Sequence, residues 1–180
     1  VYCMTLQKKN KQNTSYEWNK INYFLKKKQN RNITILYGHD NTGNLYNYKN
    51  ILHLKKKIPQ KCDFVTADGG FDFSIDFNKQ EQLSYHLLFC EIVSAFTILK
   101  TGGHFVLKIF EIHTNVTLQM IYLINLFFES VSIIKPFTSR PANSEKYLVC
   151  KGFKGITEYY LTHFYLMVEQ WTHISNNNLY

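Results

Sequence analysis

Two hydrophobic patterns alternate along this chain. Short continuous apolar runs, rich in β-branched and aromatic residues, predict strands, and longer segments with apolar residues at helical spacing predict helices. The predicted strands are Val1–Leu6, Ile33–Tyr37, Phe64–Ala67, His104–Phe110, Ser130–Ile134 and Lys146–Cys150. The predicted helices are Tyr16–Lys28, Tyr46–Lys57, Lys79–Leu99, Asn115–Phe128 and Ile156–Trp171.

This alternation of strand and helix predicts an α/β fold with a mostly parallel sheet and right-handed crossovers. The last two strands are joined by the loop Lys135–Glu145 without a helix, which predicts that the sheet ends in one antiparallel pairing. At 180 residues the chain has the length of one domain. We expect that domain to occupy residues 1–155, followed by a helical extension over residues 156–180.

The charge of the chain points to a polyanionic partner. The formal net charge is +8, with 21 lysine and arginine residues against 13 acidic ones. Nucleic acid is the first hypothesis, and a merely solvated basic surface is the alternative. The lysine runs Lys8-Lys9, Lys26–Lys28 and Lys55–Lys57 could follow an RNA backbone, although lysines at helix ends are more often solvated caps.

The four cysteines are far apart in the sequence and show no CxxC spacing, so neither a zinc site nor a disulfide framework is expected. We therefore expect the protein to be located in a reducing, intracellular compartment, either the nucleus or the cytoplasm. For a viral protein, this would be the cytoplasm of the host cell. No metal site is expected, because none of the seven histidines shows ligand spacing. No apolar run reaches the length of a membrane span, and no membrane partner is expected. Val1 is not an initiator residue, so the chain is expected to be cut from a longer protein.

The segment from Cys62 to Phe71, CDFVTADGGF, is the first candidate for a functional site. Its apolar run is typical of a strand that is buried on both faces of a parallel sheet. In doubly wound folds the ligand crevice lies at the carboxyl ends of the strands, where Asp68 would sit. The alternative is an ordinary turn, since Asp-Gly is a common turn dipeptide.

Two further charged residues lie on predicted strands or next to them. Lys108 interrupts the apolar run His104–Phe110, and Glu145 directly precedes the last strand. The three charges could therefore meet in one crevice. Apolar surroundings favour a neutral amine and nearby carboxylates favour an ammonium group, and this balance decides whether such a lysine acts as a base. The alternative is a lysine whose ammonium group reaches out to solvent.

Three motifs, ADGGF at 67–71, TGGHFVLKIF at 101–110 and KPFTSRPANSEKYLVCKGFK at 135–154, resemble the cap-specific mRNA ribose 2′-O-methyltransferases of the FtsJ type. The resemblance runs from the first residues to about Gly155. It implies a Rossmann-like fold that binds S-adenosylmethionine and acts on capped mRNA. Three members of the family's Lys-Asp-Lys-Glu tetrad match Asp68, Lys108 and Glu145, with Lys108 taking the proton of the ribose 2′-hydroxyl.

The resemblance also implies binding residues. Cofactor contacts match Asn44, Leu45 and Asp68, where Asn44 replaces a usual aspartate. RNA contacts match Asn78, Asn143 and Arg140.

The chain departs from the family at its start. The family's first strand, its glycine-rich loop and the first lysine of the tetrad all precede the equivalent of Val1–Leu6. We therefore expect the isolated chain to bind S-adenosylmethionine weakly or not at all. The alternative function is a catalytically inactive RNA-binding or scaffolding module. Methylation of ribosomal or transfer RNA is a third option, which the SRPANSE block at 139–145 disfavours.

Overall fold

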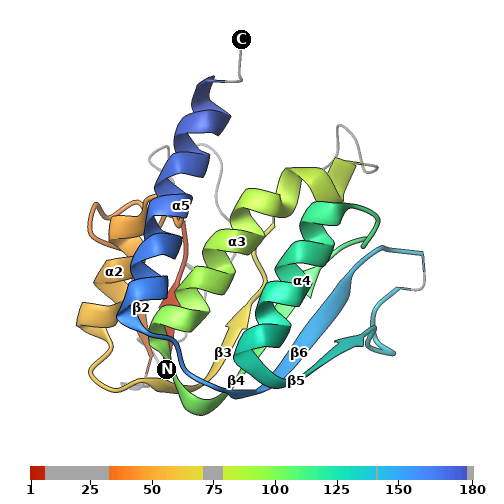
Figure 1. Ribbon diagram of the computed structural model, residues 1–180, viewed down its shortest axis with the longest axis horizontal. Coiled ribbons are helices and arrows are strands. Elements are labelled where there is room, and N and C mark those ends of the chain that lie inside the picture. The colour runs from red at the N-terminus through yellow and green to blue at the C-terminus, as the bar shows by residue number, and fades with distance from the viewer. Residues whose placement is uncertain (7–32, 71–78, 141, 178–180) are drawn as a thin grey trace, which may run out of the picture.

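The computed structural model describes residues 1–6, 33–70, 79–140 and 142–177. Its elements alternate between strand and helix over most of the chain (Figure 1). The strands are β1 (Tyr2–Met4), β2 (Thr34–Leu36), β3 (Cys62–Ala67), β4 (Leu99–Ile109), β5 (Phe128–Ile134) and β6 (Lys146–Phe153). The helices are α2 (Tyr48–Lys57), α3 (Gln80–Ile98), α4 (Asn115–Phe127) and α5 (Glu158–Asn177). The predicted helix Tyr16–Lys28 lies outside the described residues.

The strands form two separate sheets. Strands β1 and β2 pair in parallel, and the second sheet has the order β3-β4-β6-β5. Within it, β3 and β4 are parallel, whereas β6 is antiparallel to both of its neighbours. The α/β fold with one antiparallel strand is thus confirmed. The predicted antiparallel pairing at the sheet's end is confirmed, because β5 and β6 pair there in antiparallel orientation. The second antiparallel pairing, between β4 and β6, was not predicted and arises because β6 inserts between β4 and β5.

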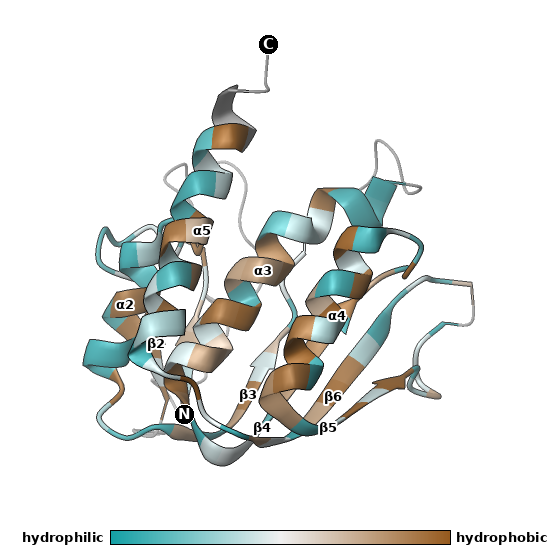
Figure 2. Ribbon diagram, in the orientation of Figure 1, coloured by the Kyte–Doolittle hydropathy of each residue, from teal (hydrophilic) through white to brown (hydrophobic). Residues whose placement is uncertain are grey.

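Helix α3 is the centre of the fold. It contacts α2, α4 and α5 as well as β3 and β4, and its residues 88–97 are all buried. Figure 1 shows α3 and α4 side by side across one face of the larger sheet, with α5 passing beside α3. Brown, apolar residues gather on α3 and α4 over the strands in Figure 2. Leu83, in the first turns of α3, is exposed.

The described helices cover only one face of the larger sheet (Figure 1). Strand β3 differs from its prediction in burial, and β4 differs in its bounds. Strand β3 was predicted to be buried on both faces, yet Phe64 is 55% exposed. Helix α3 ends at Ile98, within one residue of the predicted Leu99, but β4 starts at Leu99, well before the predicted strand His104–Phe110. Gly102 adopts φ +80° within this strand, so it bends β4.

Helix α5 completes the same hydrophobic core. Leu161, Tyr165 and Val168 are buried in the cluster that contains the inner side of α3. At its far end, Trp171 stacks on His86 of α3 at 5.3 Å, and His86 stacks on Tyr46 at 4.0 Å. The C-terminal helix is therefore fastened to the segment that precedes α2. The boundary predicted at residue 155 stays a prediction.

Candidate active site at the carboxyl edge of the sheet

Asp68 and Lys108 meet where two parallel strands end. Ala67 pairs with Leu107 in the register of β3 and β4, so the residues that follow them are neighbours. The Lys108 ammonium forms an ion pair with the Asp68 carboxylate, and its Nζ lies 3.5 Å from the Asp68 carbonyl oxygen. The Lys108 side chain is only 14% exposed, with its Nζ 5.8 Å from the centre of the Phe110 ring. The lysine thus presents its charge to the site and not to bulk solvent.

Glu145 reaches this pair through a tyrosine that the sequence analysis missed. Tyr147 lies opposite Lys108 in the antiparallel register of β4 and β6, and its hydroxyl donates to Glu145 Oε1 at 2.9 Å. Among the described residues, Lys108 forms its ion pair with Asp68 and not with Glu145. Tyr147 follows Glu145 by two positions along an extended segment, which places both side chains on one face. That spacing could have identified it.

Burial, helped by nearby carboxylates, keeps the Tyr147 hydroxyl protonated. Burial raises the pKa of Tyr147 to about 12, with further contributions from its hydrogen bond to Glu145 and from the charge of Asp68. A neutral hydroxyl remains a donor at physiological pH. It can therefore hold the Glu145 carboxylate in one orientation next to the Lys108–Asp68 pair.

The loop between β5 and β6 is organised by Lys135. Its Nζ donates to the Asn143 carbonyl oxygen at 2.7 Å, to Asn143 Oδ1 at 2.8 Å and to the Glu145 carbonyl oxygen at 3.1 Å. Ser139 Oγ donates to the same Asn143 Oδ1 at 3.1 Å. The Asn143 side-chain oxygen is thus taken up within the loop. Arg140 is exposed, and its carbonyl oxygen accepts the Asn143 N–H at 3.2 Å.

The same loop is tied to the start of α3. Ser144 Oγ donates to Gln80 Oε1 at 2.9 Å. The next residue of α3, Glu81, is buried and accepts from the backbone N–H groups of His113 and Thr114 before α4. One helix start therefore fixes two segments that border the site. Asn78, the third predicted RNA contact, lies outside the described residues.

The segment after β2 is held by a buried asparagine that sequence reasoning also missed. Asn50 of α2 accepts the N–H groups of His39 and Asp40, at 2.7 Å and 3.2 Å, and donates to the Asn44 carbonyl oxygen at 2.8 Å. A Cβ at Gly38, where φ is +81°, would lie 2.4 Å from Asn50 Cγ. Only glycine therefore fits at Gly38.

The predicted cofactor residues Asn44 and Leu45 lie in this ordered segment. Asn44 Oδ1 accepts the Tyr46 N–H at 3.0 Å, and Leu45 packs against the main core. The Asp40 carboxylate accepts hydrogen bonds from Thr42 and from the side chains of Asn47 and Asn50. Burial alone would raise the pKa of Asp40, but these hydrogen bonds outweigh it and hold the pKa well below its usual range. The segment is thus preorganised by its own polar side chains.

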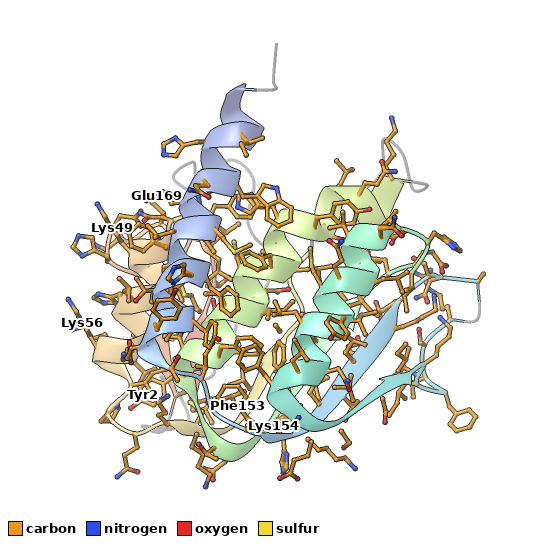
Figure 3. All side chains as sticks on the ribbon, in the orientation of Figure 1. Tyr2, Lys49, Lys56, Phe153, Lys154 and Glu169 are labelled. Carbon is orange, nitrogen blue, oxygen red and sulfur yellow. The ribbon has the colours of Figure 1, made fainter. Side chains whose placement is uncertain are left out.

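The third lysine run lies away from the site. Helix α2 begins after the segment at the carboxyl end of β2 and ends before β3, so Lys55–Lys57 lie near the opposite edge of the sheet. Lys56 points outward from α2, as does Lys49 (Figure 3). Lys55 pairs with Glu158 of α5. This arrangement favours a solvated helix end over contact with an RNA at the site.

No three His, Cys, Asp or Glu side chains in the described ranges gather so that they could hold a metal ion. Within the same ranges, every helix is too short or too polar to cross a bilayer.

The chain is similar in sequence to known proteins. The chain is 43% identical over 122 residues to "Cap-specific mRNA (nucleoside-2'-O-)-methyltransferase 1" of Mus musculus, which covers 65% of this chain and 15% of that protein. The protein of the same name in Dictyostelium discoideum is 37% identical over 142 residues, covering 76% of this chain and 19% of the relative. The chain therefore spans less than a fifth of the length of these curated relatives.

A solved structure supports the fold. An rRNA methylase from Streptococcus thermophilus superposes with a TM-score of 0.53 at 11% identity, covering 85% of this chain and 73% of that one. The family model described as FtsJ-like methyltransferase matches residues 2–153, which include β1 through β6 and every described candidate site residue. On this match, the chain belongs to the FtsJ-like methyltransferase family.

Proposed function

We propose that this chain is part of an enzyme that methylates the ribose 2′-hydroxyl of a cap-proximal nucleotide in mRNA. The observation that carries the proposal is the nearly buried Lys108 paired with Asp68 at the carboxyl edge of the sheet. Glu145 is linked to the same place through Tyr147. The names of the relatives, cap-specific mRNA methyltransferases, support the choice of substrate.

The proposed role of Lys108, as the neutral amine, is to receive the proton of the 2′-hydroxyl as its oxygen attacks a methyl group and the bond from that methyl group to its sulfonium donor breaks. A ribose hydroxyl is a weak acid, so proton removal and alignment are the main contributions that protein side chains can make. Asp68 holds the Lys108 Nζ directly. Glu145 is oriented by the Tyr147 hydroxyl and adds a second carboxylate beside the site.

S-adenosylmethionine is the proposed methyl donor, because it supplies the methyl group on an activated sulfonium. The described residues fit the adenosine half of such a ligand. Asn50 fixes the segment after β2 so that Asn44 and Leu45 stand at a strand's carboxyl end, where ligands bind in this kind of fold. Asp68 at the end of β3 is the proposed third contact.

Capped mRNA is the proposed partner. The loop between β5 and β6 is held together by Lys135 and leaves Arg140 exposed. Arginine suits phosphate contacts because of its forked donors. Asn143 and Asn78 are the further proposed RNA contacts. We also propose an intracellular location, which suits the four free thiols.

Methyl transfer by matched lysine variants tests the proposal. In the full-length protein, Lys108→Ala should lower the rate on capped RNA by about 10²- to 10⁴-fold, the usual effect of losing a general base. Lys100 offers the control, because it pairs with Asp63 between the same two strands at their other end. Lys100→Ala should keep the wild-type rate. Equal rates for the two variants would remove Lys108 from the mechanism.

A further inference from the structure

A buried carboxyl group lies directly behind the turn that carries Asp68. Glu91 of α3 is 5% exposed, and its Oε1 accepts the backbone N–H of Gly69 at 2.7 Å. Its other oxygen, Oε2, is buried without a hydrogen-bond partner among the described residues. A buried carboxyl group is costly unless it is well paired, so Glu91 requires an explanation beyond packing.

The contact between Glu91 and the turn is tight. A Cβ on Gly69 would lie 2.5 Å from Glu91 Oε1 and 2.8 Å from Leu87 Cδ2. A Cβ on Gly70, by contrast, would meet Lys108 Nζ at 3.5 Å, an ordinary contact distance. The chain therefore rests on Glu91 at Gly69, one residue after Asp68. A shift of the Glu91 carboxyl would move the Asp68 backbone relative to Lys108.

Several titratable groups face Glu91 from different elements. Burial raises the pKa of Glu91 to about 7, the charge of Asp68 adds to this rise, and the Gly69 hydrogen bond and Lys108 oppose it. Burial raises the pKa of Tyr46, which precedes α2, to about 12, and the charge of Glu91 adds to this rise. Burial first and Glu91 second also raise the pKa of Cys90, the neighbour of Glu91 on α3. Both stay neutral near pH 7. Glu91 is therefore the group of this set that changes charge near neutral pH.

We propose that Glu91 is a positioning residue of the acceptor site, which holds the Asp68 turn through Gly69 and tunes Lys108 by its own ionisation. The inference rests on the proposed function. With Glu91 neutral, Asp68 is the carboxylate paired with Lys108. With Glu91 ionised, a second negative charge lies behind the lysine and stabilises its ammonium form, so that less of the lysine is present as the neutral amine that can take up a proton.

Nuclear magnetic resonance of the 180-residue chain tests the hydrogen bond and its titration. The Glu91 13Cδ signal should titrate near pH 7, and the Gly69 amide proton should move downfield with the same midpoint, because a charged acceptor strengthens the bond. In Glu91→Gln the side-chain amide oxygen still accepts the hydrogen bond from Gly69. The Gly69 amide signal should therefore still show a hydrogen-bonded proton, but its chemical shift should no longer change with pH. A Glu91 midpoint near the ordinary 4.5, or a Gly69 signal that does not move with pH, would overturn the proposal.

The chain contains its own control on the same helix. Glu81 is also buried, but four groups donate to its carboxylate and, despite burial, these hydrogen bonds lower its pKa. The Thr114 amide, which donates to Glu81 at 3.0 Å, should therefore stay unchanged where the Gly69 amide moves. If the Thr114 amide moves together with the Gly69 amide, the shift reports a global change and the proposal fails.

Activity profiles of the full-length protein test the tuning of Lys108. Wild type and Glu91→Gln should have similar kcat/KM on capped RNA at about pH 6 and diverge above pH 7, where the variant should be the faster enzyme. Glu91→Leu, which cannot accept from Gly69, should lose about 10²-fold at every pH through misplacement of the turn. If Glu91→Leu does not fold, Glu91→Gln decides alone.

The outcomes separate the two proposals. Parallel wild-type and Glu91→Gln profiles, together with an inactive Lys108→Ala, would overturn the role of Glu91 and leave the proposed function intact. A wild-type protein without methyl transfer would overturn both.

Discussion

Replacing Glu91 by glutamine should make the chain more stable at alkaline pH. The carboxyl group is held neutral by burial, with a folded-state pKa of about 7 against an ordinary value of 4.5. Because the folded chain keeps this proton to higher pH than the unfolded chain, the wild-type free energy of unfolding falls as the pH rises through this window. Each unit of pKa shift corresponds to about 1.4 kcal/mol, so the full loss is about 3 kcal/mol.

Urea unfolding of both chains at about pH 4, below the ordinary pKa of a glutamate, and at about pH 8.5 measures this difference. The two chains should be about equally stable at the acidic pH, where both side chains are neutral, and differ by up to about 3 kcal/mol at the alkaline pH. His86 works in the opposite direction, because burial lowers its pKa and its contribution to stability grows as the pH rises. It is present in both chains, so it cancels in the comparison.

Glu81→Gln is the matched control for this experiment. The pKa of Glu81 is lowered in the folded chain, by hydrogen bonds that outweigh its burial, so its charge stabilises the fold above its unfolded pKa. Removing that charge should destabilise the chain at alkaline pH, the reverse of the Glu91 variant. If wild type and Glu91→Gln show parallel stability curves within about 0.5 kcal/mol, the argument that Glu91 is held neutral by burial is refuted.

Three further predictions follow from the contacts at the site. Gly69→Ala should destabilise the chain by about 1–3 kcal/mol in urea unfolding, because its Cβ would overlap Glu91, whereas Gly70→Ala should cost much less. Asn50→Leu should weaken S-adenosylmethionine binding by the full-length protein by about tenfold or more in calorimetry, since it leaves the N–H groups of the segment after β2 unpaired. Asp68→Asn and Glu145→Gln should each lower methyl transfer, and the double variant should lose less than the product of the two effects if the carboxylates act on one lysine.

The periodic elements could be predicted from the sequence because their signals are local. Helix α4 begins at Asn115 as predicted, where the Thr114 side chain accepts the Thr117 N–H as an N-cap. The position of β6 between β4 and β5 could not be predicted in this way, since the order of strands is decided by pairings between residues that are distant in sequence. The early start of β4 at Leu99 was not predicted, because Gly102 and Gly103 inside this strand are more typical of a loop.

In the candidate site, too, features with a local sequence signal could be predicted and features that depend on distant contacts could not. Asp68 and Lys108 could be found because a charge in or after an apolar strand is conspicuous in the sequence. Asn50 and Glu91 could not, because a buried polar residue on a helix resembles an ordinary surface position until its partners are known. Both accept backbone N–H groups from the segment after a neighbouring strand. Their roles become visible only when helix and strand end are seen together.

The most direct measurement of the central claim is the position of the methyl group after reaction of the full-length protein with labelled S-adenosylmethionine and capped RNA. The account predicts label on the ribose 2′-oxygen of a cap-proximal nucleotide in wild type, and about 10²- to 10⁴-fold less in Lys108→Ala. RNA already methylated at that oxygen should accept no label. Binding of capped RNA without any transfer of label would contradict the account and favour a catalytically inactive RNA-binding module.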